Sequence, residues 1–445
     1  MATVARRSAS SGSSSVKLPF PSVAVIGLGY VGLPTAATLA ARGVEVIGVD
    51  VNPRAVDAIN QGHAHIVEPE LDMMVRSAVK TGRLRAVTKP EPADAFIIAV
   101  PTPLKPDHTP DITYIQAAAQ AIAPVLAKGN LVILESTSPV GTTESLRDWL
   151  KAKRPDLTFP TDKTAQADIA IAYCPERVLP GQMLRELVEN DRIIGGISAR
   201  CSERARALYR VFVQGDALIT NARTAEMVKL CENAFRDVNI AFANELSIVG
   251  DKLGVDANEV IRLANHHPRV NILQPGPGVG GHCIAVDPWF LVHTAPDEAR
   301  LIRTAREVND SKPVHVIDRI DALADRFKKP VIACLGLAFK ANIDDLRNSP
   351  AMEIVEHLAR KKAGEILAVE PHVEALPKPI AGVSLVDADE AIQRADIVVL
   401  LVDHDAFREI DRDRLLDKAV VDTRGLWRWR RRIDTGNGAR KSKRR

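Results

Sequence analysis

The residues best suited to chemistry lie in one stretch, Pro275 to Pro288, which presents Cys283 on a loop with few side chains. Four of the six residues 276–281 are glycine. Each glycine costs roughly 0.5–1 kcal/mol of backbone entropy, so such a loop is typical of a place where a ligand approaches the main chain closely. A cysteine thiolate is a strong nucleophile, and the loop therefore predicts covalent catalysis by Cys283. The alternative is a structural cysteine in a glycine-rich turn.

A second motif, Gly27-Leu28-Gly29-Tyr30-Val31-Gly32, follows the β-branched segment Ser22–Ile26 and precedes an alanine-rich segment that we expect to be helical. A strand, this glycine pattern and a helix together bind a dinucleotide. The first glycine permits the tight turn, the second lets a pyrophosphate reach the backbone, and the third allows the helix to pack closely on the strand. The motif therefore predicts dinucleotide binding.

The next expected strand, Val44–Val49, ends in Asp50, about 20 residues beyond the glycines. A carboxylate at this place binds the ribose 2′-OH and repels a 2′-phosphate, so NAD is favoured over NADP. Arg54 leaves NADP open, because an arginine there can instead meet a 2′-phosphate.

Segments with strand character continue at 95–100, 131–134, 169–173 and 192–194, with helical segments between them. This alternation predicts a parallel, doubly wound sheet. Ligands of such sheets lie beyond the carboxyl ends of the strands, where Thr102, Thr137 and Glu176 fall. For the two threonines, helix capping or turn formation is the alternative.

Residues 224–253 predict one long helix, on which Lys229, Asn233 and Arg236 share a face because they are spaced by four and three. Its apolar neighbours indicate that the helix is buried, and a polar row on a buried helix faces a site or an interface. The alternative is a solvated polar stripe. We expect this central helical region to form the contacts of a homodimer or a higher homo-oligomer.

Beyond residue 312, strand-like segments repeat the plan of the first region, which predicts a second Rossmann-like lobe. Lys340 and Arg424 are placed to hold a phosphorylated ligand. The fold class is therefore α/β, with two Rossmann-like doubly wound lobes joined by a central helical region. The expected domains are a disordered tail (1–21), a dinucleotide-binding domain (22–215), a central helical domain with the cysteine loop (216–312), the second lobe (313–430) and a basic tail (431–445).

Composition favours an ordinary globular protein, with 445 residues, 46% hydrophobic and 26% charged residues and a net charge of +3. This charge is too small to imply nucleic acid as a main partner. Apolar runs are far shorter than the roughly 20 residues of a membrane span, and the N-terminus lacks the apolar segment of a secretory signal. With five cysteines and no CxxC pair, we expect a reducing compartment, the cytoplasm.

Together these segments resemble the UDP-glucose/GDP-mannose dehydrogenase family over about Ser22 to Arg428. The stretches that carry the resemblance are Arg223–Met227, Glu232–Leu246, His267–Leu273 and Gly281–Phe290. The resemblance implies oxidation of a sugar C6 alcohol to a carboxylate by two NAD⁺ in succession. Within the family, these stretches are most similar to members that act on UDP-N-acetyl-D-mannosamine. The alternatives are its C2 epimer UDP-N-acetylglucosamine or another nucleotide sugar oxidised at C6. A nucleotide-sensing scaffold without catalysis would lack Cys283, Lys229 or Asp287, and all three are present.

The resemblance also implies roles for individual residues. Cys283 would form the thiohemiacetal and thioester, Lys229 and Asn233 would stabilise the oxyanion, and Asp287 would assist the hydrolytic half. Thr137 and Glu176 would order water, with Glu176 a second candidate for the base. NAD would be contacted by Gly27, Gly29, Tyr30, Val31, Gly32, Asp50, Arg54, Thr102, Thr137 and Arg347. The UDP-sugar would be contacted by Arg177, Val178, Lys229, Asn233, Arg236, His267, Arg269, Gly280, Phe339, Lys340 and Arg424. Arg54 sits one position earlier after Asp50 than in some relatives.

Overall fold

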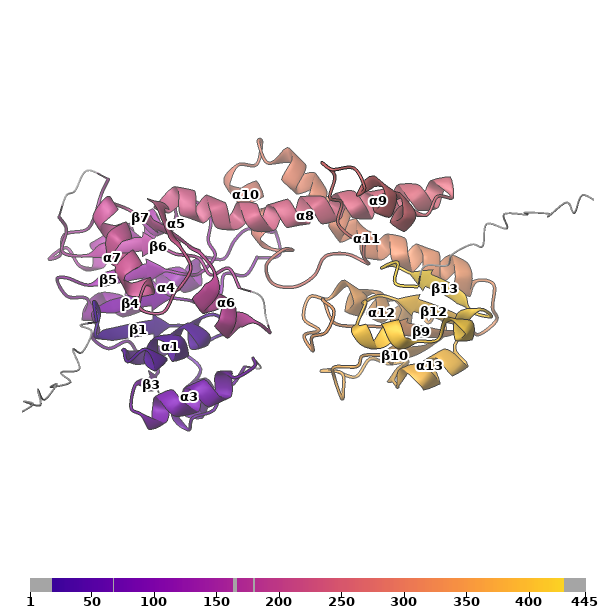
Figure 1. The fold of residues 1–445 in the computed structure, drawn as a ribbon, viewed down its shortest axis with the longest axis horizontal. Coiled ribbons are helices and arrows are strands. Elements are labelled where there is room, and N and C mark those ends of the chain that lie inside the picture. Colours follow the sequence, from indigo (N-terminus) through magenta and orange to yellow (C-terminus); the bar gives the residue numbers. More distant parts are fainter. Residues whose placement is uncertain (1–17, 67, 163–165, 179–180, 428–445) are drawn as a thin grey trace, which may run out of the picture. The chain divides into compact units, whose positions relative to one another are not determined.

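The computed structural model describes residues 18–66, 68–162, 166–178 and 181–427, which form two compact units (Figure 1). The first unit holds the described residues up to Asn233 together with Trp289–Ala299. The second holds Ala234–Pro288 and the described residues from Arg300 onward. Residues 1–17 of the expected N-terminal tail and all of the expected C-terminal tail lie outside the described residues.

An eight-stranded sheet forms the centre of the first unit, in the order β3-β2-β1-β4-β5-β6-β7-β8. Its strands are β1 (Ser22–Ile26), β2 (Glu45–Val49), β3 (Leu84–Val87), β4 (Ala95–Ile98), β5 (Leu131–Leu134), β6 (Ala170–Tyr173), β7 (Arg192–Gly196) and β8 (Ala217–Asn221). From β3 to β6 all neighbours are parallel, which confirms the predicted fold class. In contrast to the expectation of a wholly parallel sheet, β7 runs antiparallel to β6, and β8 follows β7. The reversal returns the start of β7 to the edge of the sheet at which β6 ends.

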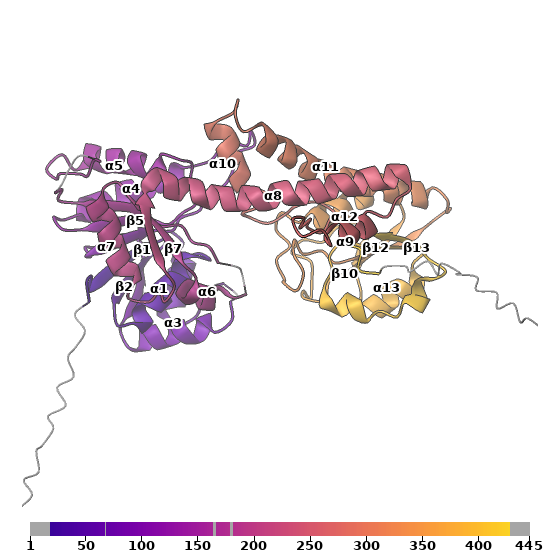
Figure 2. The same cartoon turned by 45° about the horizontal axis from the view of Figure 1, so that its top comes forward.

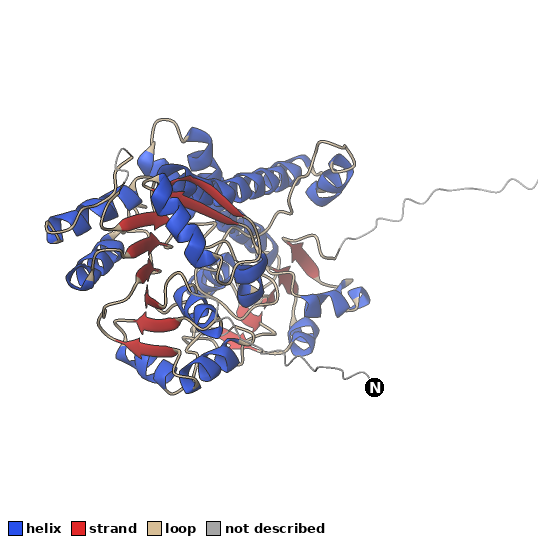
Figure 3. Ribbon diagram, turned by 60° about the vertical axis from the view of Figure 1, so that its left-hand side comes forward, coloured by secondary structure: helices blue, strands red, loops and turns tan. Residues whose placement is uncertain are grey.

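Helices cover both faces of this sheet (Figure 3). Alternate residues of one strand enter different cores: Val25 of β1 packs with α1, α3 and α7, whereas Ala24 packs with α4 and α5. The helices are α1 (Gly32–Ala41), α2 (Pro53–Asn60), α3 (Leu71–Lys80), α4 (Thr113–Ile122), η1 (Ala123–Val125), α5 (Thr142–Lys153), α6 (Met183–Glu189) and α7 (Ala199–Tyr209). Both cores are made of residues close to fully buried, so the carboxyl edge of the sheet rests on a rigid base.

The second unit contains a five-stranded parallel sheet, in the order β11-β10-β9-β12-β13. Its strands are β9 (Val331–Leu335), β10 (Glu365–Val369), β11 (Val383–Leu385), β12 (Ile397–Leu400) and β13 (Ala419–Asp422). Helices α11 (Arg300–Ala324) and α12 (Pro350–Lys361) pack in the core on one face. The other core contains α13 (Ala388–Arg394), η2 (Asp405–Glu409) and η3 (Arg412–Leu415).

The two sheets repeat the same local design, as the sequence predicts. At the end of β2, the Asp50 carboxylate accepts a hydrogen bond from the Leu28 N–H at 2.9 Å. At the end of β10, the Glu370 carboxylate accepts one from the Leu337 N–H at 2.7 Å. In each lobe, an acid on the second strand therefore holds the turn that follows the first strand.

The remaining helices are α8 (Ala222–Leu253), α9 (Ala257–Ala264) and α10 (Asp287–Thr294). In the second unit, α8 and α11 lie side by side (Figure 2) and share buried polar contacts. The Asn244 amide of α8 donates to Asn309 of α11 at 2.9 Å, and Asn309 donates to the Asp237 carboxylate at 2.8 Å. The boundary expected between residues 312 and 313 falls inside α11, so the three-domain division stays a proposal. Within the described part of the chain, no helix has both the length and the hydrophobicity that crossing a bilayer requires.

Candidate active site

The Cys283 thiol is exposed, whereas three of the other cysteines, Cys174, Cys201 and Cys334, are buried. None of the five is in a disulfide. Burial raises the pKa of Cys174 and of Cys334 to about 12, so these thiols stay protonated and inert at neutral pH. Exposure is the property that a nucleophilic thiol needs, and Cys283 shares it only with Cys231.

The loop that leads to Cys283 is held through its main chain, by residues of the same unit. The Gly276 N–H donates to the Asn244 side-chain oxygen at 2.9 Å. The Arg424 guanidinium donates to the Pro275 carbonyl at 3.3 Å. Main-chain contacts of this kind fix the path of a loop that has few side chains of its own. Arg424 was predicted to contact the substrate. In the structure its side chain holds the loop at Pro275, and the substrate contact stays a prediction.

Two glycines of the loop are required by their surroundings. A Cβ atom at Gly280 would lie 2.4 Å from the Asn348 carbonyl oxygen and 2.6 Å from the Pro350 ring. Gly281 has a φ of +87°, and a Cβ there would press on the Phe339 ring at 3.0 Å. These glycines therefore let the loop pack tightly against the second lobe, one and two residues before His282.

Asp287 follows Cys283 by one helical turn. Its N–H donates to the Cys283 carbonyl at 2.8 Å, and α10 begins at this residue. The Asp287 side chain is 3% exposed. The nucleophile and the acid predicted to assist it thus belong to one rigid local structure in the second unit.

The polar row on α8 is only partly buried. Lys229 and Asn233 of the first unit are 9% and 1% exposed, whereas Arg236 is exposed. The expectation that the whole helix is buried is wrong, because Phe235 is 69% and Phe242 52% exposed. Some apolar residues of α8 thus face outward. Because Lys229 and Asn233 are buried polar residues, the face of α8 that carries them is the candidate for a role in catalysis.

Glu176 lies just beyond β6 and is 8% exposed. Its carboxylate accepts a hydrogen bond from the Val178 N–H at 2.5 Å, which bends the chain back on itself. Arg177 forms an ion pair with Glu232 of α8 at 2.6 Å. Thr137, which follows β5, is half-buried. The predicted residues at the ends of β5 and β6 therefore lie at the carboxyl edge of the sheet, as expected.

The glycine motif after β1 has the shape of a dinucleotide cradle. A Cβ at Gly32 would lie 1.8 Å from the Gly27 carbonyl oxygen, so α1 approaches the turn as closely as glycine allows. At Gly29, by contrast, no atom lies within 4 Å of where a Cβ would be. The open space at Gly29 beside the start of α1 fits a pyrophosphate on the helix N-terminus.

Asp50 has acceptor capacity left for a ribose. Its two carboxylate oxygens accept the N–H groups of Leu28 and Asn52, both at 2.9 Å. A carboxylate offers about four lone-pair sites, so two remain for hydroxyl groups. Arg54 stands in the first turn of α2 with an exposed side chain, and Tyr30 is 41% exposed.

The predicted ligand contacts of the second unit are mostly accessible. Lys340, His267 and Arg269 are exposed and Phe339 is half-buried. Arg347 is also exposed and pairs with Asp345 at 2.7 Å. The roles of these residues stay predictions.

Glu370, His372 and His404 have donor atoms within 4.8 Å of one another, but this set does not suit a metal ion. His404 Nδ1 accepts a hydrogen bond from the Asn342 N–H at 2.9 Å. Its Nε2 must then carry the ring proton, which faces Glu370 at 3.1 Å. Both nitrogens are occupied, so His404 serves to hold Glu370 and through it the turn after β9.

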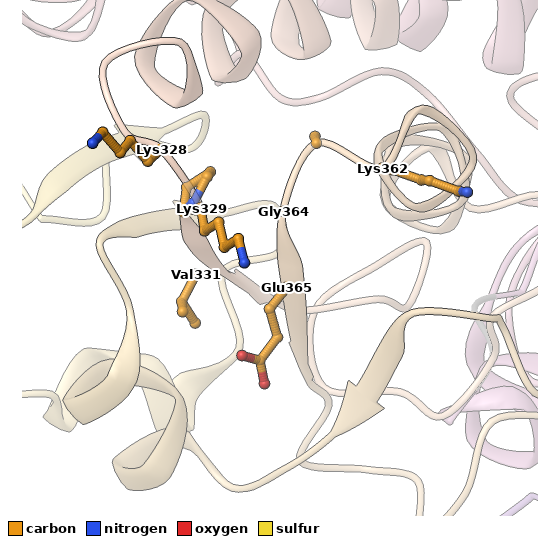
Figure 4. Close-up of a pocket in the computed structure, with 8 residues that line it drawn as sticks. Lys328, Lys329, Val331, Lys362, Gly364 and Glu365 are labelled. Carbon is orange, nitrogen blue, oxygen red and sulfur yellow. The ribbon is translucent and has the colours of Figure 1, made fainter.

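An open pocket of about 330 Å³ lies at the amino ends of β9 and β10 (Figure 4). It is lined by Lys328, Lys329, Pro330, Val331, Lys362, Ala363, Gly364 and Glu365. Lys328 and Lys362 point outward on opposite sides of it. Functional sites of such sheets lie at the carboxyl ends of the strands, and none of the predicted site residues lines this pocket.

Comparison with known proteins places the chain in one family along its length. The UDP-glucose/GDP-mannose dehydrogenase family matches with its NAD binding domain over residues 21–213, its central domain over 223–311 and its UDP binding domain over 333–428. The chain therefore belongs to the UDP-glucose/GDP-mannose dehydrogenase family. It is an NAD-dependent nucleotide-sugar dehydrogenase, as the glycine motif and the resemblance predict.

Individual relatives cover nearly the whole chain. It is 65% identical to the NDP-N-acetyl-D-galactosaminuronic acid dehydrogenase of Ralstonia nicotianae over 412 residues, which are 93% of this chain and 97% of that protein. It is 60% identical to the UDP-N-acetyl-D-mannosamine dehydrogenase of Escherichia coli over 420 residues, 92% of this chain and 100% of that one. A solved UDP-N-acetyl-mannosamine dehydrogenase from Staphylococcus aureus superposes with a TM-score of 0.80 at 41% identity, covering 91% of this chain and 95% of that one.

Proposed function

We propose that the protein oxidises the C6 alcohol of a UDP-linked sugar to a carboxylate through a covalent bond to Cys283. The exposed thiol on a tightly held glycine loop is the observation that carries the proposal. The alcohol loses four electrons as two hydrides, one to each of two NAD⁺. One water supplies the second oxygen of the product, and three protons are released.

Different residues of the protein carry out the successive steps of this reaction. After the first oxidation, the Cys283 thiolate adds to the aldehyde carbon and forms a thiohemiacetal; the second oxidation makes it a thioester. Lys229 and Asn233 stabilise the negative charge that develops on the sugar oxygen, since both are buried polar groups. Water then cleaves the thioester and returns the thiol, with Glu176 or Asp287 taking the proton of the water.

The NAD that accepts the hydrides would be held by the first unit. Gly29 leaves room for the pyrophosphate, Gly27 and Gly32 let the turn and α1 pack closely, and Asp50 meets the adenosine ribose. Tyr30, Val31, Arg54, Thr102 and Thr137, together with Arg347 of the second unit, remain proposed cofactor contacts. The UDP-sugar contacts that the resemblance implies also remain proposals. They are Arg177, Val178, Lys229, Asn233, Arg236, His267, Arg269, Gly280, Phe339, Lys340 and Arg424. Since Cys283 must stay reduced, we place the enzyme in the cytoplasm.

We propose a sugar with an acetamido group at C2, and UDP-N-acetyl-D-mannosamine in particular. The stretches His267–Leu273 and Gly281–Phe290 support this substrate, as do relatives named for it at 60% identity. A second candidate is an N-acetylgalactosamine-type substrate, because the relative at 65% identity is named for galactosaminuronic acid. UDP-N-acetylglucosamine is a third candidate substrate.

The test is a panel of nucleotide sugars assayed for NADH formation. We expect the highest kcat/KM for UDP-N-acetyl-D-mannosamine, and at least about tenfold lower values for UDP-N-acetylglucosamine, UDP-N-acetylgalactosamine, UDP-glucose and GDP-mannose. A higher kcat/KM for UDP-N-acetylgalactosamine would move the assignment to the second candidate. A higher value for UDP-glucose or GDP-mannose would contradict the acetamido-sugar proposal itself.

NAD selectivity gives another prediction, because Asp50 places a negative charge where NADP carries a phosphate. Asp50→Asn keeps the shape of the side chain and removes the charge. We expect the kcat/KM ratio of NADP⁺ to NAD⁺ to rise by roughly tenfold or more. Asp57→Asn, on the exposed side of α2, is the matched control and should leave the ratio unchanged. An unchanged ratio in Asp50→Asn would assign cofactor choice to other residues.

We also propose that α8 forms a homodimer interface. Phe235, Phe242 and Val249 are 69%, 52% and 45% exposed and are spaced by seven residues, so they form one apolar seam on the helix. A second copy of the chain is the occupant that a seam of this periodicity fits. In sedimentation, we expect a dimer for the parent and a monomer for Phe242→Glu. A parent that sediments as a monomer at micromolar concentration would refute the proposal.

A further inference from the structure

Two buried carboxylates share one buried guanidinium behind the predicted water site. Arg192 is 1% exposed, Glu135 2% and Glu176 8%. The same Arg192 nitrogen, Nη1, lies 3.7 Å from Glu176 and 3.9 Å from Glu135. Neither distance is that of a tight hydrogen-bonded pair, and among the described residues Arg192 Nε and Nη2 have no hydrogen-bond partner. The Arg192 guanidinium therefore lies near both carboxylates and is not paired with one of them alone.

The strand reversal explains how these residues meet. Tyr173 of β6 pairs with Gly195 of the antiparallel strand β7, and continuing this register by three residues sets Arg192 opposite Glu176. Glu135 comes from the end of β5, the next strand along. A parallel β7 would have carried Arg192 to the far end of the sheet.

Other elements complete the surroundings of Glu135. The Tyr209 hydroxyl of α7 donates to Glu135 at 3.2 Å, and the Thr35 hydroxyl of α1 approaches its other oxygen at 3.4 Å. The Arg192 guanidinium lies over the Tyr209 ring, 5.4 Å from its centroid. The Cys174 thiol is the remaining titratable group, and it stays neutral. The cluster thus carries one fixed positive charge and two carboxylates.

Electrostatics make Glu135 the member that titrates near neutrality. Burial raises the pKa of Glu135 to about 7; the Arg192 charge lowers it, and the Glu176 charge raises it. Below pH 7, Glu135 is neutral and the guanidinium faces Glu176 as its only anion. Above pH 7, two anions compete for one cation.

We propose that Arg192 is a positioning residue that holds the Glu176 carboxylate for the hydrolytic step. The charge of Glu135 then controls how strongly the Arg192 guanidinium interacts with Glu176. The inference rests on the proposed function, in which Glu176 meets the water that cleaves the thioester. Neither Glu135 nor Arg192 contacts the reacting atoms in this account.

The charge balance can be tested directly by infrared titration of the protonated carboxyl band of Glu135, identified as the band absent in Glu135→Gln. In the parent, the band should disappear with a midpoint near pH 7. In Arg192→Met, the midpoint should rise by more than one pH unit, since the positive charge that stabilises the Glu135 anion is gone. In Glu176→Gln, it should fall, because the neighbouring anion is gone. Midpoints that do not move in either variant would overturn the shared guanidinium.

Kinetics test the positioning role. Arg192→Met should lower kcat at least about tenfold with KM for the UDP-sugar within about threefold, because Arg192 acts on chemistry rather than binding. Arg192→Lys keeps the charge and should restore most of kcat. At a pH above the raised midpoint of Glu135, Glu135→Gln/Arg192→Met leaves one uncompensated anion instead of two and should recover part of the loss. If Arg192→Met retains the parent kcat, the positioning role is wrong.

A failure of the proposed function would look different. If Glu176→Gln retains the parent kcat, Glu176 has no part in hydrolysis and that part of the proposed mechanism fails, whatever the infrared midpoints show. If Glu176→Gln loses activity and Arg192→Met does not, only the positioning role of Arg192 is wrong. Glu176→Gln is isosteric, so its infrared midpoint tests the titration even if Arg192→Met does not fold.

Discussion

Cys283→Ala should reduce uronic-acid formation by at least about a thousandfold while binding of NAD and of the UDP-sugar stays within a few-fold of the parent. Alanine removes only the sulfur from an exposed position, so packing changes little. Without the thiol, the aldehyde has no covalent tether, and the second oxidation loses its substrate. The measurement is uronic acid quantified by mass spectrometry, with ligand affinities from calorimetry.

Cys231→Ala is the matched control, because Cys231 is the other exposed cysteine. Partial burial raises the pKa of Cys231, so its thiolate fraction at neutral pH is small. We expect parent-like activity from this variant. Iodoacetamide should label Cys283 faster than Cys231, and saturating UDP-sugar should slow the labelling of Cys283 alone. A Cys283→Ala variant within tenfold of the parent rate would make Cys283 a structural residue of the loop.

Lys229→Met should lower kcat by roughly a hundred- to a thousandfold, the usual cost of losing one group that stabilises an oxyanion. Methionine keeps the length of the side chain, and only the ammonium is lost from this 9% exposed position. KM for the UDP-sugar should change much less than kcat, because the charge on the sugar oxygen develops in the transition state. Steady-state kinetics at saturating NAD⁺ provide the measurement.

Lys252→Met on the same helix controls for a general effect of removing a lysine from α8, since Lys252 is exposed. Its kcat should match the parent. If Lys229→Met loses affinity for the UDP-sugar and keeps kcat, Lys229 is a binding residue and the oxyanion role is wrong.

Local sequence signals predicted much of this fold. The β-branched run at Ser22–Ile26, the glycine motif and Asp50 are each recognisable within a few residues, and the structure has a strand, a tight turn and an acid there. The second lobe, which the sequence predicts from its repeated plan, has the same order in the structure, with a strand at Val331–Leu335 and the acid Glu370.

Long-range contacts could not be predicted in this way. The contact between Asn244 and Gly276 joins residues 32 positions apart, and that between Arg424 and Pro275 joins residues 149 apart. No periodicity relates such positions. The contact between Glu135 and Arg192 was missed for a related reason. It depends on β7 running antiparallel to β6, and the sequence of a short apolar strand does not indicate its direction in the sheet.

The exposed seam on α8 shows a different limit. Phe235 and Phe242 suggested burial because an apolar side chain is usually covered within its own chain. The structure of one chain leaves both exposed. Hydrophobicity predicts that a surface will be covered, but it does not say whether the cover belongs to the same molecule.

We propose that the enzyme completes the four-electron oxidation without releasing an aldehyde. The number of NADH formed per UDP-sugar consumed tests this directly. With limiting UDP-N-acetyl-D-mannosamine and excess NAD⁺, the parent protein should yield two NADH per sugar, with the uronic acid as the product by mass spectrometry. One NADH per sugar, with free aldehyde accumulating in solution, would rule out the covalent mechanism through Cys283.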